Sequence, residues 1–228
     1  MIAHKKEFTG GVVMMIGFWI VFAILLSPVF AGQNLLDYMD GMYNSISKNS
    51  SYFIPANQEN AKEFTGKNID MALKAKDGAA GDRWATVLRA AGMNVESAAE
   101  ELQVSGDMGG MLVSALADAD AMFANDGGPV AARYGYDEKQ ALYDWWSILR
   151  DMERSLNKQE QFKEAKFLYQ VRTKSVEPAY NYYGIIAQSI REKALLVILS
   201  LGGYVIYTLW FGFAILFMFE GWGLRLEH

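Results

Sequence analysis

The feature that most constrains this chain is an uncharged apolar run near its C-terminus. No Asp, Glu, Lys, Arg or His occurs between Ala194 and Phe219. As an α-helix, these roughly 26 residues reach about 39 Å, whereas a bilayer's hydrocarbon core is about 30 Å thick. We therefore expect a transmembrane helix at 194–219. The amphipathic stretch from Pro178 to Lys193 is predicted to extend the same helix out of the membrane.

A second apolar run extends from Gly10 to Ala31. Val29-Phe30-Ala31 before Gly32 resembles a signal-peptidase site, so a cleavable signal peptide is an alternative reading. The run of about 21 residues exceeds the 7–15 residues of a typical signal-peptide apolar region. An uncleaved signal anchor is therefore predicted at 10–31, with Pro28 kinking or ending the helix.

The charges flanking the two runs predict the topology. Lys5 and Lys6 precede the first run, and Asp37 and Asp40 follow it, so the positive-inside rule places the N-terminus in the cytoplasm. Two spans return the C-terminus there. We expect a protein of the bacterial inner membrane with a cytoplasmic N-terminus (1–9), a periplasmic or extracellular domain (32–193) and a cytoplasmic tail (220–228). Residues 226–228 resemble the start of an affinity tag.

The exported segment shows helical periodicity almost throughout. Asp107 and Asp137 stand at positions that predict helix N-caps. Alternating runs of Val, Ile and Thr are missing, which argues against strands. The predicted fold class is all-α: a two-span integral membrane protein with a helical bundle between the spans. Helices are expected at 33–48, 56–76, 82–91, 94–103, 107–123, 137–156 and 158–177.

Several kinds of chemistry have no support in the composition. The chain has no Cys, and His4 is its only histidine outside the tag-like end. Asp118, Asp120 and Asp126 suggest a calcium loop, but the residues between them do not fit the EF-hand spacing. The net charge of −5 argues against nucleic-acid binding. We expect no catalytic residues, metal or cofactor, and no enzyme activity.

The second span carries small and hydroxyl residues on one broad face. Such residues allow close helix packing or hydrogen bonds across a helix interface. Packing of the two spans on each other, assembly with other chains and the lining of a pore all remain open. The face comprises Ser200, Gly203, Tyr204, Tyr207, Thr208 and Gly212, and a similar heptad-spaced pair in the first span is Gly10 and Gly17.

Two further groups of residues in the exported segment are candidates for binding. Aromatic residues at helical spacing usually form a core, but they could line a pocket for an apolar or aromatic ligand: Tyr180, Tyr182, Tyr183, Trp145 and Trp146. An acidic stretch predicts either solvated helix faces or a surface for a basic partner: Glu96, Glu100, Glu101, Asp118 and Asp120.

The favoured function is a non-enzymatic subunit of a membrane complex or oligomer. Its partners would be the lipid bilayer, further copies of the chain or other membrane subunits, while any ligand is unknown. Two alternatives are a homo-oligomeric channel and an extracytoplasmic ligand sensor that signals through a separate partner. Because the two spans contain no charged residue, a proton pump or ion-coupled carrier is not expected.

Overall fold

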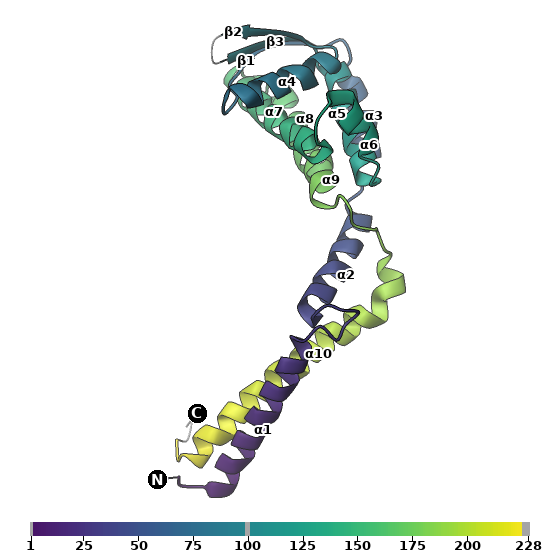
Figure 1. The fold of residues 1–228 in the computed structure, drawn as a ribbon. Coiled ribbons are helices and arrows are strands. Elements are labelled where there is room, and N and C mark those ends of the chain that lie inside the picture. The colour runs from purple at the N-terminus through teal and green to yellow at the C-terminus, as the bar shows by residue number, and fades with distance from the viewer. Residues whose placement is uncertain (1, 99–100, 225–228) are drawn as a thin grey trace. The chain divides into compact units, whose positions relative to one another are not determined.

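The computed structural model describes residues 2–98 and 101–224 (Figure 1). The chain divides into two compact units. We call Met1–Ile46 with Gln188–His228 the terminal unit and Ser47–Ala187 the central unit. The boundary between the two units falls within helix α2.

The terminal unit contains two long apolar helices. Helix α1 is Lys5–Leu25 and α10 is Ile190–Gly221, and both are long and apolar enough to cross a membrane. The two helices pack along each other. Helix α2, Leu35–Ser50, begins in this unit. The expectation of a mostly helical chain with two candidate membrane helices is confirmed.

The central unit combines helices with one small sheet. In chain order its elements are α3 (Ile54–Ala61), the short 3₁₀ helix η1 (Lys62–Phe64), β1 (Asn68–Leu73), α4 (Gly78–Ala90), β2 (Asn94–Ala98), β3 (Glu101–Asp107), α5 (Met108–Phe123), α6 (Gly128–Tyr134), α7 (Glu138–Lys158), α8 (Phe162–Val171), the π-helix η2 (Arg172–Val176) and α9 (Glu177–Asn181).

Local sequence explains where two of these helices begin. The Asp107 side chain accepts hydrogen bonds from the backbone N–H groups of Gly109 and Gly110 at the start of α5. The Asp137 side chain accepts one from the N–H of Gln140 at the start of α7. Each carboxylate satisfies donors that a helix leaves free at its N-terminus. Both predicted caps are confirmed.

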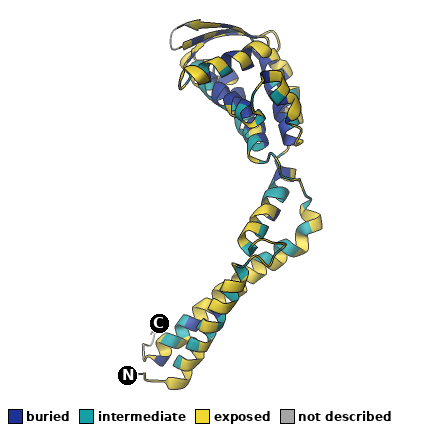
Figure 2. Ribbon diagram, in the orientation of Figure 1, coloured by how far each residue is buried: buried dark blue, intermediate teal, exposed yellow. Residues whose placement is uncertain are grey.

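The core of the central unit lies between α5, α7, α8 and the inner face of the sheet. Figure 2 shows buried residues concentrated there. Helix α7 contributes Leu142, Trp145 and Leu149, which are fully buried at helical spacing. Helix α5 contributes Leu112 and Leu116, also fully buried. These positions agree with the apolar periodicity of the sequence.

The three strands contradict the all-helical prediction. They form an antiparallel sheet in the order β1-β3-β2, with Met71 opposite Val104 and Val95 also opposite Val104. The predicted helix at 56–76 is therefore correct only as far as Ala61, where α3 ends, and the predicted helix at 94–103 is wrong. The inner residues of β1 alternate with polar ones, but Met and Leu are also good helix formers. The prediction of a helix here gave more weight to the helix propensity of Met and Leu than to the alternation of inner and outer residues.

The predicted helix from Pro178 into the second span is also interrupted. Helix α9 ends at Asn181, and α10 begins only at Ile190, where the Ser189 side chain accepts a hydrogen bond from the N–H of Arg191. Gly184, with φ +85°, lies in the left-handed region that ends helices. At the other end of the chain, α1 begins at Lys5 and ends at Leu25, before Pro28.

Candidate functional site

Close backbone contact joins α1 to α10 at two glycines. A Cβ added at Gly11 would lie 2.7 Å from the backbone nitrogen of Met218. A Cβ added at Gly221 would lie 2.4 Å from the backbone nitrogen of Phe8. No larger residue fits at either position unless the helices move apart. Small residues thus bring the two apolar helices together, as is typical of helix pairs in membranes.

Aromatic side chains fill the middle of the same contact. The ring of Phe18 stacks on Tyr207 at 4.6 Å between centroids and packs against Phe211 at 4.9 Å. The indole N–H of Trp210 donates to the carbonyl oxygen of Met14 at 3.0 Å. A Cβ added at Gly17 would lie 3.2 Å from the Trp210 ring. Of the predicted residues, Gly17 and Tyr207 therefore lie in the contact between the two helices.

The predicted small and polar face of α10 separates into two surfaces. Thr208 and Gly212 are exposed, and nothing lies within 4 Å of a Cβ added at Gly212. Gly10 of α1 is exposed and open in the same way. We call Thr208, Gly212 and Gly10 the open small residues. Ser200, Gly203, Tyr204 and Tyr207 instead line a groove within the terminal unit.

This groove, which we call the apolar groove, has a volume of about 550 Å³. One polar contact crosses it, between the Tyr43 hydroxyl and Ser200 Oγ at 2.6 Å. Ser200 donates its own proton to the carbonyl oxygen of Val197 at 2.8 Å, so Tyr43 is the donor in the first bond. The groove is lined by Phe22, Leu25, Leu26, Leu35, Leu36, Met39, Tyr43, Leu196, Leu199, Ser200, Leu201, Gly203, Tyr204 and Tyr207.

The predicted aromatic group of the central unit is distributed over different environments. Trp145 is fully buried, and its indole N–H donates to Asp118 Oδ2 at 2.9 Å. Trp146 is half-buried between two guanidinium groups, with Arg150 and Arg172 lying 4.7 and 5.3 Å from its ring centroid. Its surroundings are already occupied by protein cations.

The three tyrosines of the group also have protein partners. Lys139 lies over the Tyr180 ring at 5.1 Å. The Tyr183 hydroxyl donates to Glu138 at 2.9 Å, and this hydrogen bond raises the pKa of Tyr183 above its usual value. The carbonyl oxygen of Tyr182 accepts a hydrogen bond from Lys48. Each of the five aromatic residues therefore has a partner within the protein.

Lys48 is a buried cation that the sequence analysis did not single out. Its ammonium donates to Asn125 Oδ1 at 2.9 Å and to the carbonyl oxygens of Tyr182 and Ile185 at 3.1 and 2.7 Å. Its side chain also lies over the Phe123 ring. Burial lowers the pKa of Lys48. It connects the end of α2 to the segment that follows α9, and its position among polar residues in the sequence gave no signal of this role.

The predicted acidic surface is not continuous. Asp118 is 1% exposed and accepts hydrogen bonds from Arg133, Tyr134 and Trp145. Its prediction as a partner-binding residue is therefore wrong, because a buried, paired carboxylate presents no charge to a partner. Burial, followed by the hydrogen bond to Asp118, raises the pKa of Tyr134.

The other predicted acidic residues lie in three situations. Glu96 of β2 and Glu101 of β3 are exposed. Asp120 accepts a hydrogen bond from the Tyr52 hydroxyl at 2.7 Å, which raises the pKa of Tyr52. Glu100 lies outside the described residues.

A second buried carboxylate, Asp144, was also missed. It is 1% exposed and pairs with Arg83 at 2.9 Å. It also accepts hydrogen bonds from Tyr136 and Gln140. Burial, followed by the charge of Asp144, raises the pKa of Tyr136. Its position between the buried Ala141 and Trp145 on an amphipathic helix was the available signal, because an acid on an apolar face needs partners.

The part of the chain that the structure describes holds no cluster of three or more metal-binding side chains. The buried carboxylates Asp118, Asp144 and Glu164 take part in ion pairs and hydrogen bonds inside the central unit. Two candidate surfaces for an external partner are the open small residues and the apolar groove, both in the terminal unit. Comparison with known proteins found no matching family model, curated protein or solved structure.

Proposed function

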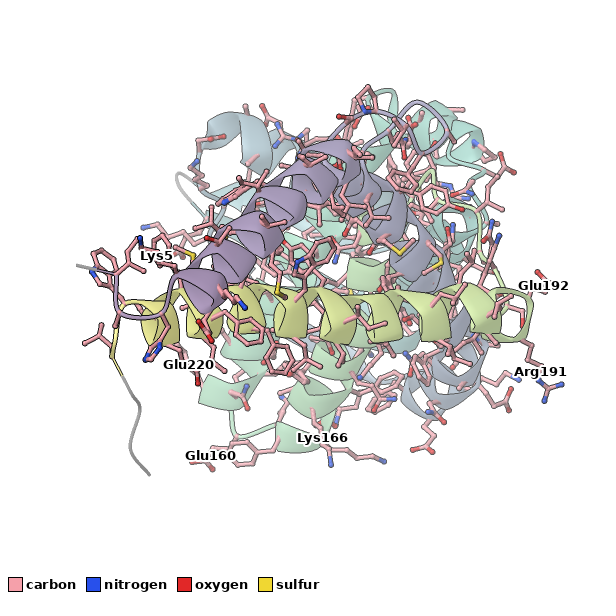
Figure 3. The ribbon with its side chains drawn as sticks, turned by 90° about the horizontal axis from the view of Figure 1, so that it is seen from below. Lys5, Glu160, Lys166, Arg191, Glu192 and Glu220 are labelled. Carbon is pink, nitrogen blue, oxygen red and sulfur yellow. The ribbon has the colours of Figure 1, made fainter. Side chains whose placement is uncertain are left out.

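We propose that this protein is a non-enzymatic subunit of a membrane assembly. Helices α1 and α10 would cross the membrane with both chain ends in the cytoplasm, and the central unit would be exported and contact a partner. Lys5 and Lys6 at the start of α1 support this orientation under the positive-inside rule. Charged residues flank the apolar helices: Figure 3 shows Lys5 and Glu220 near one end of the pair and Arg191 and Glu192 at the other end of α10.

One observation carries the assembly proposal. The packing of α1 on α10 uses Gly11, Gly17 and Gly221, whereas Thr208 and Gly212 take no part in it. The Thr208 hydroxyl donates to the carbonyl oxygen of Tyr204 at 2.7 Å and so needs no partner of its own. Intramolecular packing therefore does not account for these small residues, while a helix from another chain could approach closely there.

The test is the mass of the assembly formed by the full chain in mild detergent and in lipid nanodiscs. We expect wild type to form a complex with itself or with a co-purified membrane protein. Replacing both Thr208 and Gly212 with Leu keeps α10 apolar but blocks close approach. We expect the double variant to weaken association about tenfold, equivalent to about 1.4 kcal/mol, because the two larger side chains hold the helices apart.

Gly202→Leu is the matched control. It makes the same kind of change on the same helix, and nothing lies within 4 Å of a Cβ added at Gly202. We expect this variant to assemble as wild type does. A wild-type protein that stays monomeric without a partner, or a double variant that assembles as wild type does, would contradict the proposal.

A further inference from the structure

The apolar groove has a composition that favours a hydrocarbon ligand. Apolar side chains from α1, α2 and α10 form most of its walls. Its serine is satisfied within the protein, since Ser200 donates to Val197 and accepts from Tyr43. A polar small molecule would find few free hydrogen-bonding groups there, whereas an apolar chain requires none.

Helix α2 presents an apolar side to this groove with little protein covering it. Leu35, Leu36 and Met39 line the groove, while Asp37 and Asp40 occupy other positions on the helix. Leu36 remains 65% exposed. An amphipathic helix with an uncovered apolar side is suited to contact with lipid.

The position of the groove along α10 indicates which medium would fill it. Its wall on α10, Leu196 to Tyr207, lies inside the uncharged run 194–219. If α10 spans the bilayer, as proposed above, the inner part of this wall lies at the level of the lipid acyl chains and the outer part near their outer boundary, because the run is about 9 Å longer than the hydrocarbon core. Water is scarce at that depth, so an unfilled groove would lose packing contacts along its whole lining.

Lys193 is the cation that helical spacing places on the groove side of α10. The α10 residues Leu196, Ser200, Gly203 and Tyr207 are spaced by three and four, which puts them on one side of the helix. Lys193 precedes Leu196 by three residues and so continues the same side towards the N-terminal end of α10. A cation at the outer end of an apolar groove complements an anionic headgroup.

The size of the groove favours a lipid chain over a helix from a second copy. A helix about 10 Å across would fill the groove's 550 Å³ with about 7 Å of its length, which is little more than one turn. An unbranched acyl chain is thinner and bends to follow an irregular space. The groove can enclose little more than one turn of a helix, whereas it can enclose a longer stretch of an acyl chain.

We propose that the apolar groove binds one acyl chain of a membrane phospholipid, with the lipid phosphate near Lys193. The proposal depends on the membrane location in the proposed function, but not on assembly. Surrounding lipid is as apolar as the groove, so the chain is held by filling a void rather than by the hydrophobic effect.

Gly203→Phe tests the proposal because it fills the groove from within. Gly203 lines the groove, and nothing lies within 4 Å of a Cβ added there, so the new ring has room. Gly202→Phe is the matched control: the neighbouring glycine is equally open but does not line the groove. Full-length wild type and both variants are reconstituted in phosphatidylglycerol vesicles containing a fraction of phosphatidylglycerol with a photoreactive group on one acyl chain.

After illumination, mass spectrometry measures the label on peptides containing Tyr43 and Leu199. We expect Gly203→Phe to reduce this labelling about tenfold, equivalent to about 1.4 kcal/mol, while Gly202→Phe labels as wild type does. Lys193→Gln should reduce labelling less, because it leaves the apolar walls intact. Equal labelling of wild type and both glycine variants would show only bulk lipid contact and overturn the proposal.

Two further readouts separate the possible failures. Flotation with the vesicles shows whether the protein is in the membrane, and a protein that does not float contradicts the proposed function as well. The assembly mass of Gly203→Phe shows whether the groove instead receives a second copy. Loss of assembly with unchanged lipid labelling would overturn the lipid proposal and leave the assembly proposal standing.

Discussion

The two units of this protein bury apolar side chains in opposite ways. In the central unit, large residues such as Trp145, Leu112 and Leu149 are fully buried. In the terminal unit, Phe18, Met42 and Ala214 are buried, but Leu195 and Ile206 are 69% and 68% exposed. In Figure 2, exposed residues cover most of α1 and α10, whereas buried residues are concentrated inside the central unit. The central unit covers its own apolar core, whereas the terminal unit leaves long apolar helix faces uncovered, which is compatible with a membrane protein.

The two units also differ in how their polar groups are paired. The central unit buries charged groups and pairs them, as with Asp118 and Asp144. The terminal unit satisfies its hydroxyls locally, since Ser200 and Thr208 donate to backbone carbonyls within α10. A fold that faces water can bury paired charges in its core, because its other charges remain solvated. A helix in lipid must satisfy its polar groups internally.

The largest predicted effect comes from breaking the buried network of the central unit. Asp118→Ala removes the acceptor of the Tyr134 hydroxyl and the partner of Arg133, and it leaves the Trp145 indole N–H with only its longer bond to the Tyr134 hydroxyl. We expect the free energy of unfolding to fall by about 3 kcal/mol. Denaturant unfolding of the full chain in detergent, followed by tryptophan fluorescence, measures the change.

Asp120→Ala is the matched control on the same helix. Asp120 is less buried and accepts one side-chain hydrogen bond, from Tyr52. Its loss should cost about 1 kcal/mol or less. If the two variants lose the same stability, the distinction between a buried network and a surface contact in α5 is wrong.

A smaller, more local effect is expected at Lys48. Lys48→Met keeps much of the apolar stem but removes the donor shared by Asn125, Tyr182 and Ile185. We expect a loss of about 1–2 kcal/mol in unfolding free energy. Amide hydrogen exchange should accelerate at Gly184, whose N–H donates to the same Asn125 oxygen.

Lys139→Met provides the comparison for this variant. Lys139 is exposed and lies over the Tyr180 ring, so its removal should leave exchange at Gly184 unchanged. Unaltered exchange in Lys48→Met would mean that Lys48 does not hold the segment after α9.

The smallest predicted effect is a pH dependence at Glu164 of the central unit, a buried carboxylate with a partly exposed partner, Lys67. Lys67 lies 2.6 Å from Glu164, and this hydrogen bond lowers the pKa of Glu164 below 4.5. The unfolded chain therefore binds the proton more readily than the folded one. The stabilisation is complete above pH 4.5 and is lost as the pH falls through the lowered pKa of the folded state.

Glu164→Gln should thus cost about 1 kcal/mol at neutral pH and nothing in strong acid. Denaturation curves of wild type and variant across this range measure the difference. Glu63→Gln removes the exposed pair with Lys163 and should show no such pH dependence. A Glu164→Gln deficit that stays constant with pH would exclude the ion pair as its cause.

Local signals in the sequence were sufficient for several features of the fold. The uncharged runs identified both candidate membrane helices, because a long apolar helix needs no tertiary context to be recognised. Asp107 and Asp137 predicted two helix starts, because a cap depends on residues only three or four positions apart. The amphipathic pattern of α7 identified most of its buried positions.

Pairing between distant residues was beyond the reach of the sequence pattern. Met71 belongs to a strand because β3 lies beside it, although its neighbours also suit a helix. Asp118 appeared to be a surface acid, but Arg133, Tyr134 and Trp145 converge on it and permit its burial.

The same division applies to the candidate site. The composition of α10 indicated that its small and hydroxyl residues face something other than lipid alone, because such residues are not needed for membrane insertion. Only the tertiary structure separated Gly203 and Ser200, which line the groove, from Thr208 and Gly212, which remain open. The sequence determined where apolar and small residues occur along the helix. Which of them lie beside a neighbour was decided by the packing of α1 and α2, since contact depends on distance in space rather than along the chain.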